Sequence, residues 1–297
     1  MIEAGAITPI EVITSSRRQF LQGALTLGVA FAVAEATEDI LPKKGPLFGY
    51  FERIDKKTKE QLLQFSPVTI AHTGGNSISH LEMSKIAGVD FVEADIKSYQ
   101  GRLSVTHGEN LKTQLLDIGG RLFGLGSSVP LVADLVETSI SNNQRLFLDL
   151  KEESIDDNNT IARIVEKYGI EDKVVYSGEW MALDGIAQIT QSGDNLFYSI
   201  DNEQLLYRFL DEQKSRHGLG VSLSFILARA DIIKALRAHE VSRVFVYGAD
   251  YSYEIIPVLE AGADGVITGN LEVLEVWQNQ KFERFWVQKE ITANRAA

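Results

Sequence analysis

The chain has 297 residues, of which 44% are hydrophobic and 24% are charged, so it can bury a substantial core in one large domain or two small ones. This composition excludes intrinsic disorder and collagen-like structure. The formal net charge of -12 provides no overall positive field, and we find no local basic patch, so we expect no nucleic-acid partner. The absence of cysteine from the sequence excludes disulfides, thiolate metal sites and cysteine nucleophiles. Any chemistry must therefore use carboxylates, histidine, lysine, hydroxyl groups or a metal with oxygen and nitrogen ligands.

The N-terminal segment has the order of an export signal. The pair Arg17-Arg18 precedes an apolar run of small residues over 23–34. We interpret residues 1–36 as a twin-arginine signal peptide that ends at the A-x-A site Ala34-Glu35-Ala36. The apolar run is shorter than the roughly 20 residues that span a bilayer, so we expect an exported protein, periplasmic or extracellular, with no transmembrane segment after cleavage. An amphipathic N-terminal helix of the domain is the alternative.

Residues 37–66 are expected to form a linker with a short helix around 55–64, followed by one domain over 67–297. From Val68 onward, short β-rich runs alternate with amphipathic stretches, which predicts βα units on a parallel sheet. Strands are expected at 68–72, 91–96, 103–107, 145–150, 174–176, 196–200, 220–225, 244–247 and 265–268. Helices are expected at 78–87, 131–141, 160–168, 180–192, 203–216, 230–239 and 253–261. Several of them are expected to end at a C′ glycine, namely Gly88, Gly169, Gly193 and Gly262.

These repeats, in a length near the roughly 250 residues of one eightfold barrel, predict a single-domain (β/α)8 TIM barrel. The nine expected β runs are one more than the eight strands of such a barrel. The turn at Gly101, between the second and third runs, is too short to contain a crossover helix. We therefore expect one of the runs 91–96 and 103–107 to leave the barrel at its rim. An open doubly wound sheet is the alternative architecture. The glycine-rich segment 119–128 lacks the third glycine of a dinucleotide-binding loop, and we interpret it as a rim loop.

Polar side chains gather at the expected carboxyl ends of the strands, where barrel enzymes have their active sites. Glu93 and Asp95 lie two residues apart, as do Asp149 and Lys151, so each pair projects to one face of its strand. Three converging carboxylates repel one another unless a cation lies between them, and hard oxygen ligands suit Mg2+ or Ca2+. We therefore predict a divalent metal site at Glu93, Asp95 and Asp149. Structural ion pairs or helix caps are the alternative.

Two histidines are expected at the same rim, because His72 and His107 each end a β run. Two imidazoles beside a divalent metal suit phosphoryl transfer, in which one acts as nucleophile or base and the other as acid. Lys151 would neutralise phosphate charge. The other histidines fall on helices or in loops, and we interpret them as structural: His80, His217 and His239.

Segments 70–74 (Ile-Ala-His-Thr-Gly), 88–95 (Gly-Val-Asp-Phe-Val-Glu-Ala-Asp) and 103–107 (Leu-Ser-Val-Thr-His) resemble three motifs of one superfamily. These are the H-R-G, G-A-D-x-I-E-x-D and V-x-x-H-D motifs of the glycerophosphodiester phosphodiesterases. Segments 147–151 and 262–268 agree with later motifs in the same order, so the resemblance covers about residues 67–275. It implies a TIM-barrel hydrolase that cleaves phosphoric diesters in lipid metabolism.

Four departures from these motifs make the sequence similar to the sphingomyelinase D-like phospholipase D branch of that superfamily. Thr73 replaces the arginine of H-R-G, Gly75 stands in the place of the metal-binding glutamate of E-N-T, Gly108 replaces the aspartate of H-D, and Asp149 replaces the glutamate of E-x-K. The disulfide-bonded catalytic loop of that branch cannot form in a chain without cysteine. Glu82 could replace the missing glutamate, but its position within a helix predicts a solvated surface residue.

The resemblance to this branch also implies ligands and substrate contacts. Its Mg2+ is held by an E-x-D pair and the aspartate of D-L-K, which correspond to Glu93, Asp95 and Asp149. The segment Tyr-Gly-Ala-Asp at 247–250 corresponds to a W-T-V-D motif. Tyr247 and Asp250 are therefore expected to border the site as substrate contacts.

The function expected from these residues is an exported, Mg2+-dependent phosphodiesterase acting on glycerophosphodiesters or phospholipid head groups. One alternative is a phospholipase D-like enzyme that releases the head group with formation of a cyclic phosphate, when a substrate hydroxyl attacks the phosphate. A second is a catalytically weak exported binding protein on the same barrel. A metallo-peptidase is disfavoured because the sequence has no H-E-x-x-H motif.

Substrate specificity is expected to come from rim segments at Glu109–Val129 and Tyr176–Trp180. Trp180 and the aromatic residues at 282–286 could contact lipid, but packing against the core is the stronger expectation.

Overall fold

The computed structural model describes residues 54–99, 102–105, 131–151, 154–190, 195–212, 219–270 and 272–280. All of them belong to the second of two units into which the chain divides, residues 46–297. The expected signal segment and the glycine-rich segment 119–128 lie outside the described residues. Among the helices that are described, none combines the length and apolarity needed to cross a membrane.

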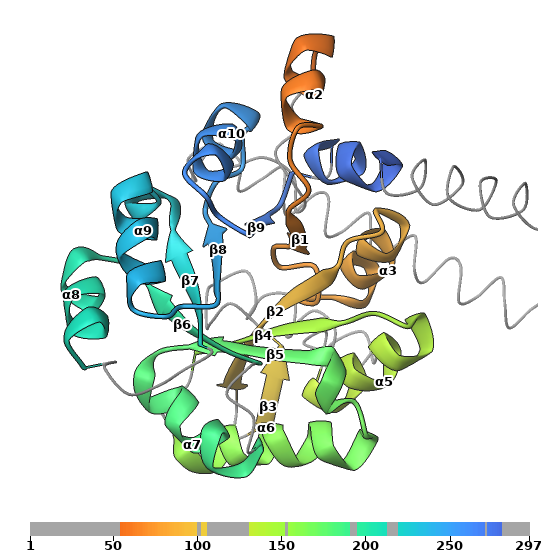
Figure 1. Ribbon diagram of the computed structural model, residues 1–297. Coiled ribbons are helices and arrows are strands. Elements are labelled where there is room, and N and C mark those ends of the chain that lie inside the picture. Colours follow the sequence, from red (N-terminus) through yellow and green to blue (C-terminus); the bar gives the residue numbers. More distant parts are fainter. Residues whose placement is uncertain are drawn as a thin grey trace, which may run out of the picture. The chain divides into compact units, whose positions relative to one another are not determined.

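Nine strands occur within the described residues, and they match the expected β runs (Figure 1). They are β1 Val68–Ala71, β2 Phe91–Tyr99, β3 Arg102–Val105, β4 Leu146–Leu150, β5 Val174–Gly178, β6 Leu196–Ile200, β7 Gly220–Ser224, β8 Arg243–Tyr247 and β9 Gly265–Thr268. Parallel pairing runs from β1 through β9, β8, β7, β6, β5 and β4 to β2, and β2 pairs again with β1. The sheet therefore closes into the expected eight-stranded (β/α)8 TIM barrel, and the open doubly wound alternative is wrong.

Strand β3 is the ninth run and lies outside the barrel. It pairs antiparallel with the end of β2, and Val105 lies opposite Ile96. This is the predicted excursion at the rim, since the short turn after Tyr99 leaves room only for a hairpin. Strand β2 extends as far as Tyr99, three residues beyond the expected run, because the hairpin prolongs it.

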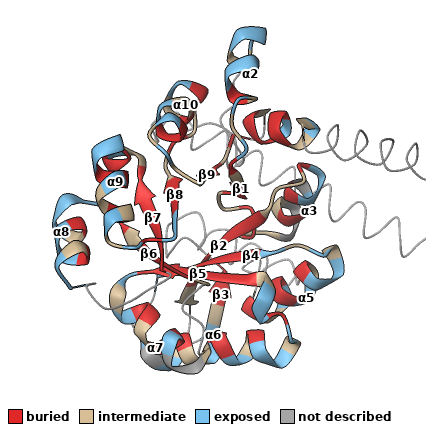
Figure 2. Cartoon of the chain, viewed as in Figure 1, coloured by how far each residue is buried: buried red, intermediate tan, exposed pale blue. Residues whose placement is uncertain are grey.

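The helices cover the outside of the barrel. They are α2 Lys56–Leu62, α3 Ile78–Ile86, α5 Val132–Asn142, α6 Ile155–Tyr168, α7 Trp180–Thr190, α8 Glu203–Glu212, α9 Ala230–Ala238 and α10 Ser252–Glu260. Residues 272–280 are also helical. Figure 2 shows buried strands and helices that are buried on one face and exposed on the other. This pattern is what amphipathic stretches produce when they pack against a barrel.

Helix ends follow local capping signals. Gly88, Gly169 and Gly262 have positive φ of 60°, 64° and 101°, as their expected C′ positions require. The expected start of α6 at residue 160 is wrong by five residues. Ser154 caps the helix by accepting from the backbone N–H of Asp157 at 3.3 Å, and the acidic first turn favours this earlier start.

The inside of the barrel has an apolar floor. Seven buried side chains from seven strands form it: Ile70, Phe91, Phe147, Val175, Phe197, Phe245 and Ile267. The Phe197 and Phe245 rings stack at 4.5 Å between centroids. Strand β7 contributes Gly220 at this level, where a Cβ would lie 2.4 Å from the Phe197 ring. Residues further along each strand lie above this floor, at the carboxyl rim.

Candidate active site

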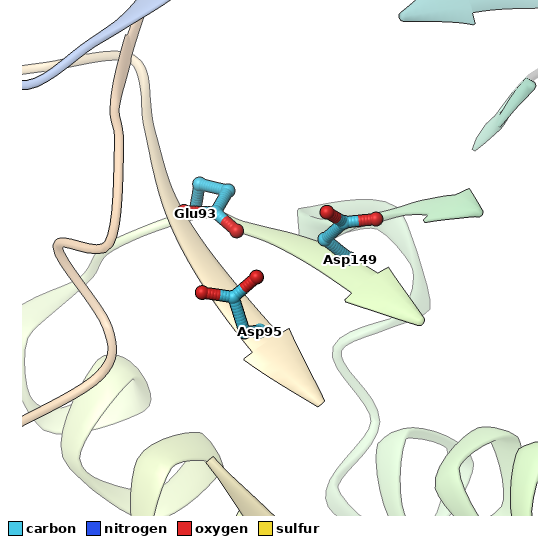
Figure 3. Close-up of side chains that lie close together, drawn as sticks. All are labelled: Glu93, Asp95 and Asp149. Carbon is cyan, nitrogen blue, oxygen red and sulfur yellow. The ribbon is translucent and has the colours of Figure 1, made fainter. Parts of the chain in front are cut away.

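Three carboxylates from two neighbouring strands lie close together, as Figure 3 shows. Asp95 on β2 and Asp149 on β4 are direct cross-strand partners in the parallel register. Glu93 precedes Asp95 by two residues and therefore shares its inward face. One oxygen from each group lies within 4.8 Å of the others. The structure thus brings together the three residues that the sequence assigned to a metal.

The convergence of these carboxylates costs stability in the metal-free chain. Glu93 is only 3% exposed and Asp95 only 1%. Burial raises the pKa of Glu93 well above its usual range, and the charges of Asp95 and Asp149 raise it further. Burial likewise raises the pKa of Asp149, against the opposing effect of Lys151. Such mutual repulsion in a buried position is relieved by a cation.

The donor set fits a hard divalent cation. All three groups offer carboxylate oxygens, which suit Mg2+ and Ca2+ better than zinc. The described part of the chain places no histidine in this cluster of potential ligands. The residues present therefore fit Mg2+, and Ca2+ fits the same donors.

Lys151 lies beside the carboxylates. Its Nζ is 3.1 Å from Asp95 Oδ1 and also pairs with Asp149 Oδ2. Burial acts to lower the pKa of Lys151, but the neighbouring carboxylates outweigh it and hold this pKa above its ordinary value. The amine is therefore a permanent cation at neutral pH, with 35% of its side chain exposed to meet an anion.

Asn76 fixes the orientation of Asp95, a contact that the sequence analysis did not identify. Its Nδ2 donates to Asp95 Oδ2 at 2.7 Å, and its Oδ1 accepts from the Asp95 backbone N–H at 2.9 Å. One carboxylate oxygen is thereby held by Asn76, and Oδ1 is left on the side of Lys151. The only sequence signal was its place in the segment that corresponds to E-N-T.

The loop after β1 explains the missing glutamate at position 75. The Gly75 N–H donates to the Glu93 carbonyl at 2.8 Å, and a Cβ on Gly75 would lie 2.7 Å from Ala94 Cβ. The neighbouring Thr73 has a positive φ of 54°, which is strained for a β-branched residue. That conformation aims its N–H at Glu93 Oε2, 2.5 Å away. The backbone itself therefore binds Glu93, and a larger side chain at position 75 has no room.

The two expected catalytic histidines differ in what the structure shows. His72 directly follows β1 and is half-buried, and its backbone N–H donates to the Thr268 carbonyl at 3.0 Å. A charge on His72 contributes to lowering the pKa of Asp149, less than Lys151 does. His107 lies outside the described residues, two positions beyond the end of β3.

The two expected substrate contacts also differ. Tyr247 ends β8, and its hydroxyl donates to Asp201 Oδ1. Burial raises the pKa of Tyr247, as does this bond. Asp250 Oδ1 instead accepts from the Thr268 hydroxyl and the Gly269 N–H, each at 3.0 Å, so this oxygen holds the turn after β9.

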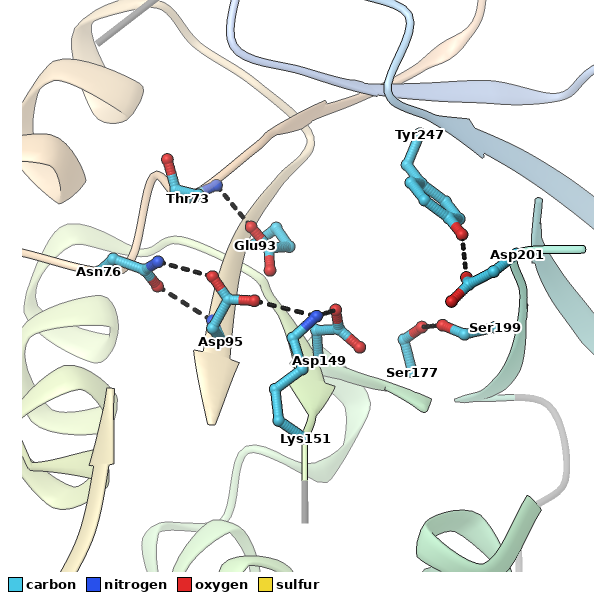
Figure 4. A network of polar contacts seen from close by, with 10 residues as sticks. All are labelled: Thr73, Asn76, Glu93, Asp95, Asp149, Lys151, Ser177, Ser199, Asp201 and Tyr247. Carbon is cyan, nitrogen blue, oxygen red and sulfur yellow. Dashed lines mark hydrogen bonds and ion pairs between the residues drawn. The ribbon is translucent and has the colours of Figure 1, made fainter. Parts of the chain in front are cut away.

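Further polar residues at the rim were missed by the sequence analysis. Asp201 directly follows β6, and the hydroxyls of Ser177 and Ser199 lie 3.1 Å apart. Figure 4 shows them and Tyr247 on the side of Asp149 away from Glu93 and Asp95, with Ser177 next to Asp149. Asp201, like Asp149, lies at the carboxyl end of a strand, so the same criterion identifies it as a candidate site residue. It was not predicted because it belongs to none of the motifs that the sequence resembles.

The remaining expectations concern surface and packing residues. Glu82 is exposed on α3 and accepts from Asn142 Nδ2 at 2.9 Å, as expected for a solvated residue. Trp180 packs on Tyr198 and Phe209, with centroids 4.9 and 5.7 Å apart, which confirms its packing role.

The rim segment expected at Tyr176–Trp180 is only partly a loop, and its role in specificity stays a prediction. Its first three residues belong to the buried strand β5, because the strand continues past the apolar run. The other rim segment, Glu109–Val129, and the aromatic residues at 282–286 are not among the described residues. His80 lies on α3 and His239 at the C-cap of α9, as expected for structural residues, and His217 lies outside the described ranges.

Comparisons with known proteins show which fold this is. No protein-family model and no curated protein sequence matches the chain. An Oleispira antarctica phosphodiesterase, solved with the product sn-glycerol-3-phosphate, is 14% identical with a TM-score of 0.57, covering 72% of this chain and 98% of its own. A glycerophosphodiester phosphodiesterase from Parabacteroides distasonis is 16% identical with a TM-score of 0.55, covering 73% and 100%. A third, from Agrobacterium tumefaciens, is 17% identical with a TM-score of 0.52, covering 72% and 99%.

At such low identities the likeness establishes the fold. The chain is a (β/α)8 TIM barrel of the arrangement seen in these phosphodiesterases, and it spans nearly their whole length.

Proposed function

We propose that this chain is an exported, Mg2+-dependent phosphodiesterase that acts on glycerophosphodiesters or phospholipid head groups. The observation that carries the proposal is the convergence of Glu93, Asp95 and Asp149 within 4.8 Å of one another, with Lys151 beside them at the carboxyl rim of the barrel. Active sites of TIM barrels lie at this rim. Phosphodiesterases of the same fold, one of them solved with sn-glycerol-3-phosphate, support the choice of reaction.

The carboxylates and the lysine divide the task of binding the phosphate. Glu93, Asp95 and Asp149 would hold Mg2+, which would stabilise negative charge on the phosphoryl oxygens when bound. Lys151 supplies a second positive charge that binds a phosphate oxygen. Asn76 keeps one oxygen of Asp95 fixed, so that the other stays directed into the site.

The histidines would move the protons. In hydrolysis, one imidazole accepts a proton from the attacking water as the new P–O bond forms. The other donates a proton to the alcohol oxygen as the old P–O bond breaks. His72 is one member of the pair, and we propose His107 as the other. Direct attack by a histidine nitrogen, followed by hydrolysis of the P–N bond, uses the same two residues.

A second reaction is release of the head group with formation of a cyclic phosphate. In that case a substrate hydroxyl next to the phosphate replaces water as the attacking group. This candidate is supported by the similarity of the sequence to the phospholipase D-like branch, which includes the glycine at position 75; the packing there leaves no room for a fourth carboxylate. A binding protein without turnover is the remaining candidate.

Phosphorus NMR of the products distinguishes these candidates. Wild type with Mg2+ is expected to cleave glycerophosphocholine or a lysophospholipid, and the phosphorus shift separates a monoester from a cyclic phosphate. His107→Ala and His72→Ala are expected to lose about 10^2- to 10^4-fold in rate, whereas the surface variant Glu82→Gln is expected to keep wild-type turnover. Full activity of either histidine variant, or in excess chelator, would contradict the mechanism. Binding without any product would leave the binding-protein candidate.

Export is tested separately. Replacement of both Arg17 and Arg18 by lysine is expected to retain the precursor inside the cell, because the arginine pair is the defining feature of this signal class. Unchanged export, measured by cell fractionation, would refute this part of the proposal.

A further inference from the structure

Two arginines lie at the amino end of the barrel, on the far side of the apolar floor from the carboxylates. Arg145 immediately precedes β4, and Arg243 is the first residue of β8. Each stands two residues before a ring of the floor, Phe147 or Phe245, and residues two apart on a strand share one face. Both arginines therefore start on the inward face, beneath the floor. For Arg145 the guanidinium confirms this direction, since its carbon lies 4.0 Å from the centroid of Phe91, another member of the floor.

The two arginines start from opposite sides of the barrel. In the closed sheet β4 and β8 lie opposite each other, and the Phe147 and Phe245 rings meet between them with centroids 6.1 Å apart. The arginines stand one inward position below these rings on the same two strands. Because an arginine side chain is longer than that of phenylalanine, a single anion near the barrel axis is within reach of both guanidinium groups.

Neither guanidinium is neutralised by the described part of the chain, where neither forms a hydrogen bond or an ion pair. The carboxylates at this end are turned elsewhere. Asp90 and Asp264 alternate with inward residues and so face outward: Asp90 Oδ2 accepts from the N–H and the hydroxyl of Thr69 at 2.8 and 2.9 Å, and Asp264 pairs with an arginine of α9. Glu171 and Asp172, before β5, are exposed. The two inward cations are thus left for a ligand.

A phosphate group fits two guanidinium groups better than a carboxylate does. Each guanidinium presents a planar fork of N–H groups that binds two oxygens. One fork satisfies a carboxylate, which has two oxygens and a single charge. A phosphate monoester has three terminal oxygens and nearly two charges at neutral pH, so it matches two forks. The face of Arg145 lies over Phe91, which leaves its N–H edge for such a ligand.

The apolar floor separates these arginines from the proposed catalytic residues. Along β4, Arg145, Phe147 and Asp149 share one face in that order, so the arginine and the carboxylate lie on opposite sides of the floor. We propose that Arg145 and Arg243 form an anion site at the amino end of the barrel, which binds the phosphate group of a ligand. This site is independent of the phosphodiesterase activity proposed above.

Calorimetric titration of inorganic phosphate in excess chelator tests the site, because without metal the three carboxylates repel an anion at the other rim. Wild type is expected to bind phosphate and not acetate. Arg145→Gln and Arg243→Gln are each expected to weaken this binding by about tenfold, the effect of losing charge-assisted hydrogen bonds. Lys151→Met, at the carboxyl rim, is expected to leave it unchanged. The matched control is Arg163→Gln, which removes an exposed arginine of α6 and is expected to bind phosphate like wild type.

Chemical labelling of wild type tests the site without any variant that could fail to fold. Phosphate is expected to protect Arg145 and Arg243 from an arginine-specific glyoxal reagent, as measured by peptide mass spectrometry, and to leave Arg163 unprotected. Equal labelling of all three with and without phosphate would overturn the site. So would binding of acetate as tight as that of phosphate, loss of binding in Lys151→Met, or an equal loss in Arg163→Gln.

Two further measurements identify the ligand and separate this site from the catalytic one. Binding of sn-glycerol 3-phosphate tighter than that of inorganic phosphate would assign the site to an esterified phosphate, and the reverse order to the free ion. Turnover of 4-nitrophenyl propyl phosphate is expected to be the same in Arg243→Gln as in wild type. Lost turnover together with unchanged phosphate binding in this variant would overturn the inference. A wild type without turnover would contradict the proposed function alone, since phosphate binding at the amino end does not depend on it.

Discussion

The mouth of the barrel has two unlike halves above one apolar floor. The carboxylate side, made of His72, Glu93, Asp95, Asp149 and Lys151, concentrates charge on β1, β2 and β4. The hydroxyl side, made of Ser177, Ser199, Asp201 and Tyr247, has neutral groups on β5, β6 and β8 and one carboxylate directly after β6. On the carboxylate side burial opposes ionisation of Glu93 and Asp149, whereas on the hydroxyl side the groups satisfy one another in pairs.

The two halves differ in how much their polar groups destabilise the folded chain and in what each half can bind. Buried like charges are unfavourable and are retained where a cation or a substrate compensates them. Paired hydroxyls cost little and can exchange their partners for those of a ligand. Under the proposed function, the carboxylate side would bind the reacting phosphate, and the hydroxyl side would face the part of the substrate that does not react.

The largest expected effect is that of removing the metal. Excess chelator is expected to lower phosphodiester turnover by at least about 10^3-fold, equivalent to about 4 kcal/mol of transition-state stabilisation. Restored Mg2+ is expected to recover it. The measurement is the steady-state rate on 4-nitrophenyl propyl phosphate, which does not depend on the hydroxyl side. A rate that chelator does not change would contradict the metal-binding role of the carboxylate side, and with it the functional difference between the two halves.

The next largest effect is expected at Asn76, which orients Asp95 through two hydrogen bonds. Asn76→Ala is expected to weaken Mg2+ affinity by about 10- to 100-fold, the usual effect of losing a group that orients a ligand. Calorimetric titration of Mg2+ measures it. The matched control is Asn142→Ala, whose amide contacts only Glu82 and Lys85 on α3 among the bonds described. Equal affinities in the two variants would refute the positioning role of Asn76.

Gly75→Ala tests whether packing excludes a fourth carboxylate. The added Cβ would lie 2.7 Å from Ala94 Cβ and 3.2 Å from the Glu93 carbonyl, so the variant is expected to lose about 1–3 kcal/mol of unfolding free energy. Urea denaturation in chelator measures this loss. A variant as stable as wild type would show that the loop can move and that position 75 is open to larger residues.

The smallest effect is the pH dependence of the metal-free protein. Because the pKa of Glu93 is raised, the folded chain binds this proton more tightly than the unfolded chain does, so stability falls as pH rises from the ordinary carboxyl range through the raised pKa. Glu93→Gln lacks this charge. Its advantage over wild type in unfolding free energy is therefore expected to grow as the pH rises above the ordinary carboxyl range. A difference independent of pH would contradict the charge repulsion assigned to this side.

Much of this arrangement could be predicted from the sequence. Alternating β runs and amphipathic stretches predicted the barrel, and the i, i+2 spacing of Glu93 and Asp95 predicted their shared face. The contact of these residues with Asp149 depends on the register between β2 and β4, which are distant in the sequence. The sequence predicts this register only approximately, from the position of each residue near the end of its strand. The metal role of all three remains a prediction.

Of the hydroxyl side, only Tyr247 was predicted, from a motif, and the reason why the other members were missed is physical. Serines and a single aspartate at strand ends have many structural uses, so one such residue indicates little until the barrel closes and brings its partners together. Asn76 was missed for the same reason, since its bonds to Asp95 join a loop to a strand 19 positions away. His107, by contrast, was predicted from a motif and lies outside the described residues.

Comparison of Asp149→Asn with Asp201→Asn tests most directly the division of labour between the two halves. Both variants make the same chemical change, and kcat/KM is measured for the glyceryl and propyl esters of 4-nitrophenyl phosphate. Asp149→Asn is expected to lose at least about 10^3-fold on both substrates with their ratio unchanged, whereas Asp201→Asn is expected to reduce the ratio about tenfold. Turnover near wild type in Asp149→Asn, or the same change of ratio in both variants, would contradict the account.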